Sequence, residues 1–157
     1  MRDSVWSNDD CESILHSTQS EVEFYKEIDG IPFKGFFDAY HKGHVVDIKT
    51  TGTASSRAFQ KTCSEHDYYL QATIYVAVAD MLAGYEEGDS RTNFFWLAIE
   101  RDAPHNVAVY KLDPLDYWRV RERLTYLIGQ FVNWDGEPQT YYDGIQKMSL
   151  PDWHKEW

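Results

Sequence analysis

The sequence predicts an α/β (α+β) domain with a central mixed sheet of about five strands flanked by helices. Segments with the alternation and composition of strands are separated by segments with helical periodicity. Their order along the chain is three strands, a helix, two strands and a helix. The length of 157 residues suits one domain with a real core, because 43% of the residues are hydrophobic.

The composition excludes several classes of protein. No segment approaches the roughly 18 consecutive apolar residues of a membrane span. The N-terminus lacks the apolar core of a signal peptide, so we expect a cytoplasmic protein without a membrane partner. Cys11 and Cys63 match no zinc or iron–sulfur spacing and are expected to be free thiols. The net charge of −11 argues against a uniformly basic nucleic-acid binder, but a carboxylate-rich cation site would also lower it.

The first half of the chain begins with a polar segment and continues as three strands. We expect residues 1–20 to be irregular, with at most a short helix near residues 11–16. Alternation and strand-forming residues then predict strands at residues 20–28, 31–41 and 44–51. Each pair of neighbouring strands is joined by two turn-forming residues. These pairs are Asp29-Gly30 and Lys42-Gly43.

A helix is expected after the third strand. Residues 51–63 are rich in turn-forming residues and are expected to hold one helical turn at most. Ser64, with Asp67 three residues later, is typical of a helix N-terminus. Gly84 is typical of a helix end, so we expect the helix at residues 65–82.

The last elements are two strands, a second helix and a tail. The strands are expected at residues 92–100 and 106–112. Asp113 suits an N-cap and Pro114 the first helical position, which predicts a helix to about residue 133. The aromatic residues 134–157 are expected to be irregular and to pack back on the body.

The second hairpin carries ionisable side chains among strand-forming residues. With a two-residue turn, Asp38 lies opposite Asp47 and Phe36 lies opposite Lys49. Opposite Cβ atoms are about 5 Å apart, so the two carboxylates repel each other unless a cation lies between them or one is protonated. Asp47 and Lys49 share a face because side chains alternate along a strand. A longer turn would remove this pairing, and a salt bridge on a solvated face is the alternative interpretation.

Two carboxylates and one ammonium group suit metal-assisted hydrolysis of a phosphodiester. Hard oxygen ligands bind Mg²⁺ or Mn²⁺. Such an ion activates water and offsets the charge that develops on the phosphate oxygens. A lysine can orient the water or stabilise the transition state. We therefore predict a metal-dependent catalytic centre that contains Asp38, Asp47 and Lys49.

The predicted helix at residues 65–82 places Gln71 on an otherwise apolar stripe. Tyr68, Gln71, Tyr75 and Leu82 fall at helical spacing. Core packing explains the tyrosines as well as a function does. The amide of Gln71 needs a polar partner, which favours a role in orienting the lysine, the substrate or a water molecule.

Three segments, "GFFDAY", "HVVDIKTT" and "YYLQATIY", together resemble the PD-(D/E)xK nuclease superfamily. Within it, the sequence is most similar to the RecE-type and RecB-like phage exonucleases. The family pattern is an aspartate ending one strand, then D/E-x-K and two threonines in the next, then a helix with Q-x-x-x-Y. The matching residues are Asp38, Asp47, Lys49, Gln71 and Tyr75.

The resemblance assigns roles to these residues. It implies that Asp38 and Asp47 ligate Mg²⁺ or Mn²⁺ together with the backbone carbonyl of Ile48. Lys49 would be the catalytic lysine. Glu21 matches a glutamate that these proteins often carry on the first strand, and it is expected as a further ligand.

The sequence departs from the family at its front. Many RecB-like nucleases carry a metal-ligating histidine on a helix well upstream of the first aspartate, and His16 does not lie where that histidine is expected. The other histidines near the motifs are expected in a turn, a strand and a helix surface. They are His41, His44 and His66. The four-cysteine cluster of the CRISPR-associated relatives is absent, so no iron–sulfur cluster is implied.

The resemblance implies a single nuclease-like domain over residues 1–157 with a restriction-endonuclease-like core. The expected function is that of a recombination-type exonuclease on linear duplex DNA, although the residues leave an endonuclease open. Arg57 and Lys61 are the expected phosphate contacts. Expected partners are DNA, further copies of the chain in a ring around DNA, and a recombination protein of a phage, in which case the location is the host cytoplasm.

A nuclease fold without cleavage is the alternative. Such a protein would bind DNA or another protein, as a phage recombination or defence-evasion factor, or mimic DNA with its acidic surface. The missing upstream histidine and the charge of −11 favour this interpretation. The presence of Asp38, Asp47 and Lys49 argues against it, because a protein that does not cleave DNA does not need these three residues together.

Overall fold

The computed structural model describes residues 1–86, 89–136, 145 and 147–149. One mixed sheet runs through it in the order β1-β2-β3-β4-β5. The strands are β1 (Gln19–Ile28), β2 (Ile31–His41), β3 (His44–Thr51), β4 (Asn93–Glu100) and β5 (Val107–Lys111). Only the β3–β4 pair is parallel among these strands. The predicted α/β class with a five-stranded mixed sheet is confirmed.

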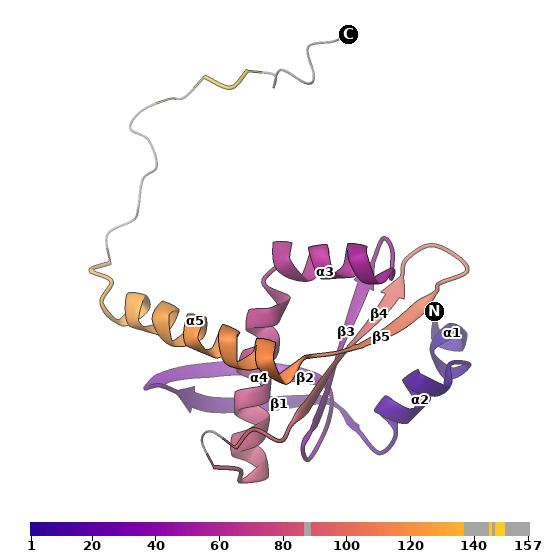
Figure 1. Cartoon of the computed structure of the whole chain (residues 1–157), viewed down its shortest axis with the longest axis horizontal. Coiled ribbons are helices and arrows are strands. Elements are labelled where there is room, and N and C mark those ends of the chain that lie inside the picture. The colour runs from indigo at the N-terminus through magenta and orange to yellow at the C-terminus, as the bar shows by residue number, and fades with distance from the viewer. Residues whose placement is uncertain (87–88, 137–144, 146, 150–157) are drawn as a thin grey trace.

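Helices cover both faces of the sheet (Figure 1). The long helices are α3 (Ser56–Glu65), α4 (Tyr68–Ala83) and α5 (Pro114–Val132), which share one core with the sheet. The short helices α1 (Arg2–Trp6) and α2 (Asp9–Leu15) pack on the other face. Side chains of β3 alternate between the cores, because Val45 belongs to the first and Val46 to the second. Asp47 and Lys49 therefore belong to the face that α3, α4 and α5 cover.

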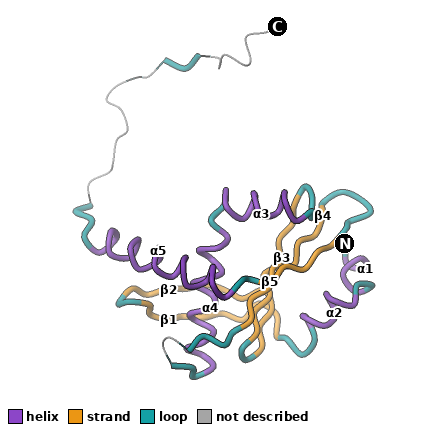
Figure 2. Tube along the Cα trace, viewed as in Figure 1, coloured by secondary structure: helices purple, strands orange, loops and turns teal. Residues whose placement is uncertain are grey.

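The expectation that residues 1–20 are irregular is wrong, because most of them form α1, α2 and the start of β1. The side chain of Asn8 accepts a hydrogen bond from the backbone N–H of Cys11 and caps α2. Val5, Cys11 and Ile14 are buried against the second face of the sheet. Their burial stabilises helices whose polar sequence gives little indication of them. The β4–β5 loop lies beside this N-terminal segment (Figure 2), where the hydroxyl of Ser4 donates to the carbonyl of Pro104.

The helix predicted at residues 65–82 is present as α4, but it begins at Tyr68, and the helix that precedes it was not predicted. The chain forms two helices, α3 and α4, with a turn between them at which Asp67 takes a left-handed conformation. Ser64 lies inside α3 and donates to the carbonyl of Gln60, so it caps no helix. Residues 51–63 contain most of α3 because Phe59 and Cys63, one turn apart, are buried in the core. The predicted end at Gly84 is confirmed, with φ of 75° at the C-cap.

The second half of the chain follows the prediction closely. β4 and β5 lie within one residue of the expected strands. Asp113 caps α5 by accepting a hydrogen bond from the N–H of Leu115, and Pro114 is the first helical residue. Within the described part of the chain, none of the helices combines the length and apolar character that crossing a bilayer requires. The expected packing of the tail falls largely on residues 137–157, which lie mostly outside the described residues.

Candidate active site

The hairpin β2–β3 has the predicted register at its turn but diverges before the two aspartates meet. His41 pairs with His44, and the ladder continues to Ala39 and Val46, where it ends. Asp38 and Asp47 are therefore not partners in the ladder, and neither are Phe36 and Lys49. This expectation is wrong because β2 stays paired with β1 while β3 follows β4 over its whole length.

A side chain replaces the missing backbone pairing. Oδ2 of Asp38 accepts a hydrogen bond from the N–H of Ile48 at 2.7 Å. The carboxylate of Asp38 is thus hydrogen-bonded to the backbone of Ile48, the residue between Asp47 and Lys49. The two aspartates still interact, since the charge of Asp38 raises the pKa of Asp47. The carboxylates come together across a divergent pair of strands.

Asp47 is the most deeply buried charged side chain of the site. The residue is 2% exposed. Burial raises its pKa, the ammonium group of Lys49 opposes this rise, and Asp38 adds to it. Nζ of Lys49 lies 2.9 Å from Oδ1, to which it donates, and 2.7 Å from Oδ2. Oδ2 therefore contacts the ammonium group as an ion pair, although this contact lacks hydrogen-bond geometry.

Lys49 begins a chain of polar contacts that leads to α4. Its ammonium group also donates to Oε1 of Gln71 at 2.9 Å. Nε2 of Gln71 donates to the hydroxyl of Tyr75 at 3.2 Å. The ring of Tyr75 meets Phe24 and Phe37 edge-on, at 5.5 and 5.3 Å between centroids. The structure thus brings Lys49, Gln71 and Tyr75 into one network beside Asp47, in which Gln71 has the polar partners that its position requires.

The oxygen atoms of this site fit a hard divalent cation. The carboxylates of Asp38 and Asp47 place two negative charges beside the single ammonium group of Lys49, and a cation would offset the excess negative charge. Asp38 and Asp47 are the carboxylates that could hold such an ion, as oxygen ligands suited to Mg²⁺ or Mn²⁺. The contribution of the Ile48 carbonyl stays a prediction.

Glu21 is an exposed residue of β1 that belongs to no cluster of potential metal ligands among the described residues. It lies in β1 between residues that pair with Ala39 and Phe37, and it has a positive φ of 54°. This register places it across from Asp38, but it is exposed. Among the described residues, no group of three or more histidine, cysteine or acidic side chains is placed to hold a metal ion. A role for Glu21 as a ligand stays a prediction.

Of the four histidines considered in the sequence, three are exposed and one contacts α2. Nε2 of His44 lies 2.7 Å from the carbonyl oxygen of Ile14 and links β3 to α2, and burial lowers its pKa. His16 and His41 are exposed at the ends of α2 and β2. His66 is exposed after α3 and stacks on Tyr68 at 5.5 Å. His41 and His44 thus lie in the expected turn and strand, and His66 lies at the surface next to a helix.

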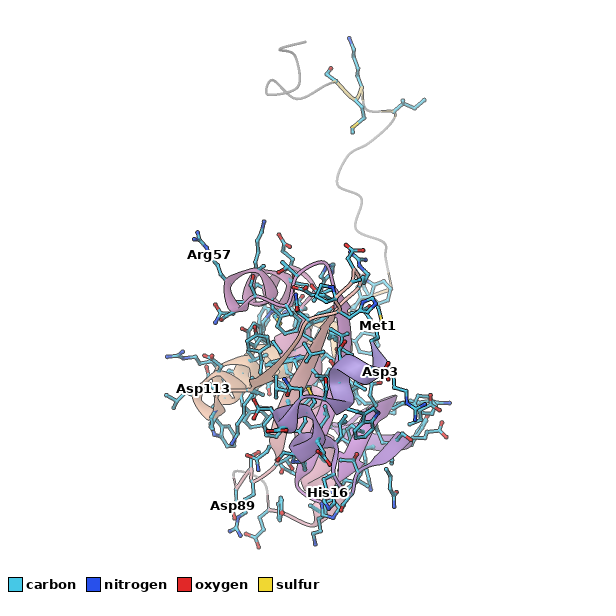
Figure 3. The ribbon with its side chains drawn as sticks, turned by 90° about the vertical axis from the view of Figure 1, so that its right-hand side faces the viewer. Met1, Asp3, His16, Arg57, Asp89 and Asp113 are labelled. Atoms are coloured by element: carbon cyan, nitrogen blue, oxygen red, sulfur yellow. The ribbon has the colours of Figure 1, made fainter. Side chains whose placement is uncertain are left out.

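The two expected phosphate contacts lie on α3. Arg57 and Lys61 are both exposed, and Lys61 pairs with Glu65 at 3.5 Å. Figure 3 shows Arg57 at the edge of the molecule, directed away from the body and far from His16. The guanidinium group of Arg101 lies close to Gly52, just beyond the end of β3. Arg101 is a basic residue near the end of β3 that the sequence did not indicate, because only the parallel pairing of β3 and β4 brings the ends of these strands together.

Cys63 is a neighbour of the site that the sequence did not indicate. The charges of Lys49 and Asp47 both act on its thiol, and burial, the largest cause, raises its pKa to about 11. Recognition of a helix at residues 56–65 would have placed Cys63 on its inner face. At this pKa the thiol is protonated at neutral pH and serves as core packing.

Both carboxylate oxygens of Glu100, at the end of β4, accept hydrogen bonds from neighbouring loops. One of its oxygens accepts from the N–H of Ala54 at 2.9 Å, and the other accepts from the amide of Asn106 at 2.7 Å. The hydrogen bond from Ala54 is the main cause of a lowered pKa. Glu100 thus joins the loop after β3 to the loop after β4.

Comparisons with known proteins identify the family and the fold of the chain. Residues 1–131 match a family described as "PDDEXK-like domain of unknown function (DUF3799)". The fold is similar to the crystal structure of a protein from Eubacterium rectale named "Putative exonuclease", with a TM-score of 0.70 and 14% sequence identity. The similarity covers 98% of this chain and 62% of that chain, so this chain spans less than two thirds of that protein's length. No curated protein matches the sequence.

Proposed function

The chain belongs to the family of PDDEXK-like domains, within the PD-(D/E)xK nuclease superfamily, and we propose that it is a divalent-metal-dependent deoxyribonuclease. The observation that carries this proposal is the buried Asp47. The residue is 2% exposed, its carboxylate is paired with Lys49 at 2.7 Å, and the negative charge of the Asp38 carboxylate also acts on it. This is an arrangement that a structural salt bridge does not require, because such a pair has no use for a second carboxylate.

The ligands would be Asp38, Asp47 and the backbone carbonyl of Ile48. When bound, Mg²⁺ or Mn²⁺ would offset negative charge on the phosphate and activate a water molecule. Asp38 also fixes the backbone of β3 through the N–H of Ile48, which holds this short segment in place. The carboxylates thus orient the segment as well as supply negative charge.

Lys49 would act on the phosphate. Its ammonium group is directed by the amide of Gln71, which Tyr75 holds in turn. A fixed positive charge stabilises the developing charge of a phosphodiester in hydrolysis, because little reorganisation is needed during the reaction. Gln71 and Tyr75 would therefore keep Lys49 oriented beside Asp47, which would be a ligand of the cation.

The substrate in this proposal is linear duplex DNA, cut from its ends as in recombination. The resemblance to RecE-type and RecB-like exonucleases supports this choice. Arg57 and Lys61 would meet phosphates from the surface of α3. Further copies of the chain in a ring, and a recombination protein, are the proposed partners. A ring would allow a chain of net charge −11 to gather its basic groups around DNA.

Cleavage of linear and circular duplex DNA with Mg²⁺ or Mn²⁺ tests the proposal. The variants are Asp47→Asn, Lys49→Met and, as a matched control, Lys34→Met. Lys34 forms an exposed pair with Glu23 at 3.2 Å, away from the site. We expect loss of linear DNA alone, abolished in the first two variants and unchanged in the control.

Other outcomes lead to different conclusions. Cutting of the circle would identify an endonuclease. No cleavage with either metal would contradict an enzyme and favour a nuclease-fold protein that only binds DNA or another protein. The charge of −11 is the observation that favours this second function.

A further inference from the structure

The ammonium group of Lys49 has a third neighbour besides Asp47 and Gln71. Nζ lies over the ring of Tyr68, 4.6 Å from its centroid. This distance is within the range of about 6 Å at which a cation is attracted to an aromatic face. The side chain of Lys49 is only 16% exposed, so water weakens this attraction little. Lys49 is therefore held by a carboxylate, an amide oxygen and an aromatic ring.

The backbone between α3 and α4 determines where Tyr68 lies. Asp67 precedes it in a left-handed conformation with φ of 52° and ψ of 34°. Its carboxylate accepts two hydrogen bonds from Arg123 of α5, at 2.6 and 3.2 Å. The ring of His66 stacks on Tyr68 with an interplanar angle of 26°. The turn between the helices thus fixes the backbone before Tyr68, and His66 stacks on its ring.

We propose that Tyr68 is a positioning residue that holds the ammonium group of Lys49 beside Asp47 and Gln71. Binding of a cation by Asp47 weakens the ion pair to Lys49, since one carboxylate then serves two positive groups. The ring of Tyr68 keeps its attraction for the ammonium group in that state. Lys49 consequently stays in place for the phosphate. The placement of Lys49 stands on the geometry alone, whereas its consequence for cleavage rests on the proposed function.

Packing is the competing explanation of Tyr68, because its ring also contacts the core cluster. Two substitutions separate the explanations. Tyr68→Phe keeps the aromatic face and removes only the hydroxyl group. Tyr68→Leu keeps apolar bulk and a high helix propensity but removes the face. Tyr68→Met replaces the leucine variant if that variant does not fold.

Nuclear magnetic resonance of the full chain measures the placement directly. Protons above an aromatic face are shifted upfield, and Lys49→Met identifies the Hε resonances of Lys49 by their disappearance. We expect an upfield shift in the wild type and in Tyr68→Phe, and its loss in Tyr68→Leu. An unshifted Lys49 in the wild type, or a shift that survives in Tyr68→Leu, would overturn the inference.

Cleavage of linear duplex DNA with Mn²⁺ measures the consequence. Loss of the contact should lower kcat about fivefold with KM unchanged, and Tyr68→Phe should retain wild-type values. Equal losses in both variants, or a wild-type rate in Tyr68→Leu, would overturn the positioning role in cleavage. If the wild type cuts no DNA, the proposed function fails, while the resonance shifts still decide where Lys49 is held.

Discussion

At the scale of single residues, burial makes the carboxylate of Asp47 depend on the ammonium group of Lys49. Taking two charges out of water is costly, and their attraction compensates only when both are present. The carboxylate is almost fully enclosed, with a side chain 3% exposed. Removal of the lysine leaves this carboxylate without its cation, so the effect on stability depends on whether Asp47 is charged.

We therefore expect Lys49→Met to lower the free energy of unfolding by about 3 kcal/mol at pH 7. The pKa of Asp47 is raised in the folded state, so protonation of this carboxyl group stabilises the fold. That stabilisation is fully present below the unfolded pKa near 4 and is lost as pH rises through the folded pKa. The defect should accordingly shrink as pH falls and Asp47 is protonated. Urea denaturation at pH 7 and pH 4.5 measures both effects.

Lys34→Met is the control for this prediction. Its partner is also a carboxylate, but both side chains are more than half exposed, at 60% and 56%. Exposed pairs contribute little, so the change should stay within about 0.5 kcal/mol at both pH values. Equal destabilisation by the two substitutions would show that the pair at Asp47 is no more costly to break than a surface salt bridge.

At the scale of elements, the hairpin β1–β2 is tied to α5 at its tip. Asp29 in the turn accepts two hydrogen bonds from Arg121, both at 2.9 Å, and one from Thr125 at 3.2 Å. The hydrogen bonds from Arg121 are the main cause of a lowered pKa of Asp29. This contact joins residues 92 positions apart in the sequence. It holds the hairpin that carries Asp38 against the helical layer.

We expect Asp29→Asn to destabilise the fold by about 1 kcal/mol at pH 7, because the contact is partly exposed to water. The folded pKa of Asp29 is depressed, so its stabilisation is present above the unfolded pKa near 4 and lost as pH falls through the folded pKa. The difference from wild type should therefore disappear in strongly acidic solution. Urea denaturation at pH 7 and at pH 2.5 measures it.

Asp116→Asn tests whether this effect belongs to the hairpin contact. Asp116 pairs with Arg119 within α5 at 3.0 Å, with side chains 44% and 76% exposed. Its replacement should leave stability nearly unchanged at either pH. A loss as large as that of Asp29→Asn would assign the effect to the charge of α5 rather than to the tip of the hairpin.

At the scale of the whole molecule, the sheet separates the helices α3, α4 and α5 from α1 and α2 (Figure 1), and Asp47 and Lys49 lie on the side of the first three. β2 and β3 supply the carboxylates, and α4 supplies Gln71 and Tyr75. The residues of the site therefore depend on the packing of a helix on a sheet. A ligand that binds them should stabilise the folded state as a unit.

We expect millimolar Mg²⁺ or Mn²⁺ to raise the melting temperature of the protein. The cation binds the folded state and relieves the repulsion between Asp38 and Asp47, whereas the unfolded chain holds no such pair. Asp38→Asn and Asp47→Asn should each abolish the increase, and Asp116→Asn should retain it. Calorimetry with and without the metal measures the change. An unchanged melting temperature in the wild type would count against a metal held by these carboxylates.

Much of the sheet could be predicted from the sequence, for a local reason. Alternation along strands, turn-forming pairs and the cap at Asp113 depend on neighbouring residues and on backbone sterics. The five motif residues lie on strands and a helix that this local pattern identifies. The resemblance of the three motif segments to PD-(D/E)xK nucleases predicted the superfamily and the restriction-endonuclease-like fold, and both are confirmed.

Tertiary structure alone decided the remaining features. The helices α1, α2 and α3 form because Val5, Cys11 and Phe59 bury side chains against a sheet that local periodicity does not describe. The divergence of β2 from β3 follows from the pairing of each strand with a different neighbour, which turned the expected Asp38–Asp47 pair into a contact with the N–H of Ile48. The sequence by itself determined which groups could form the site, and long-range packing determined how they meet.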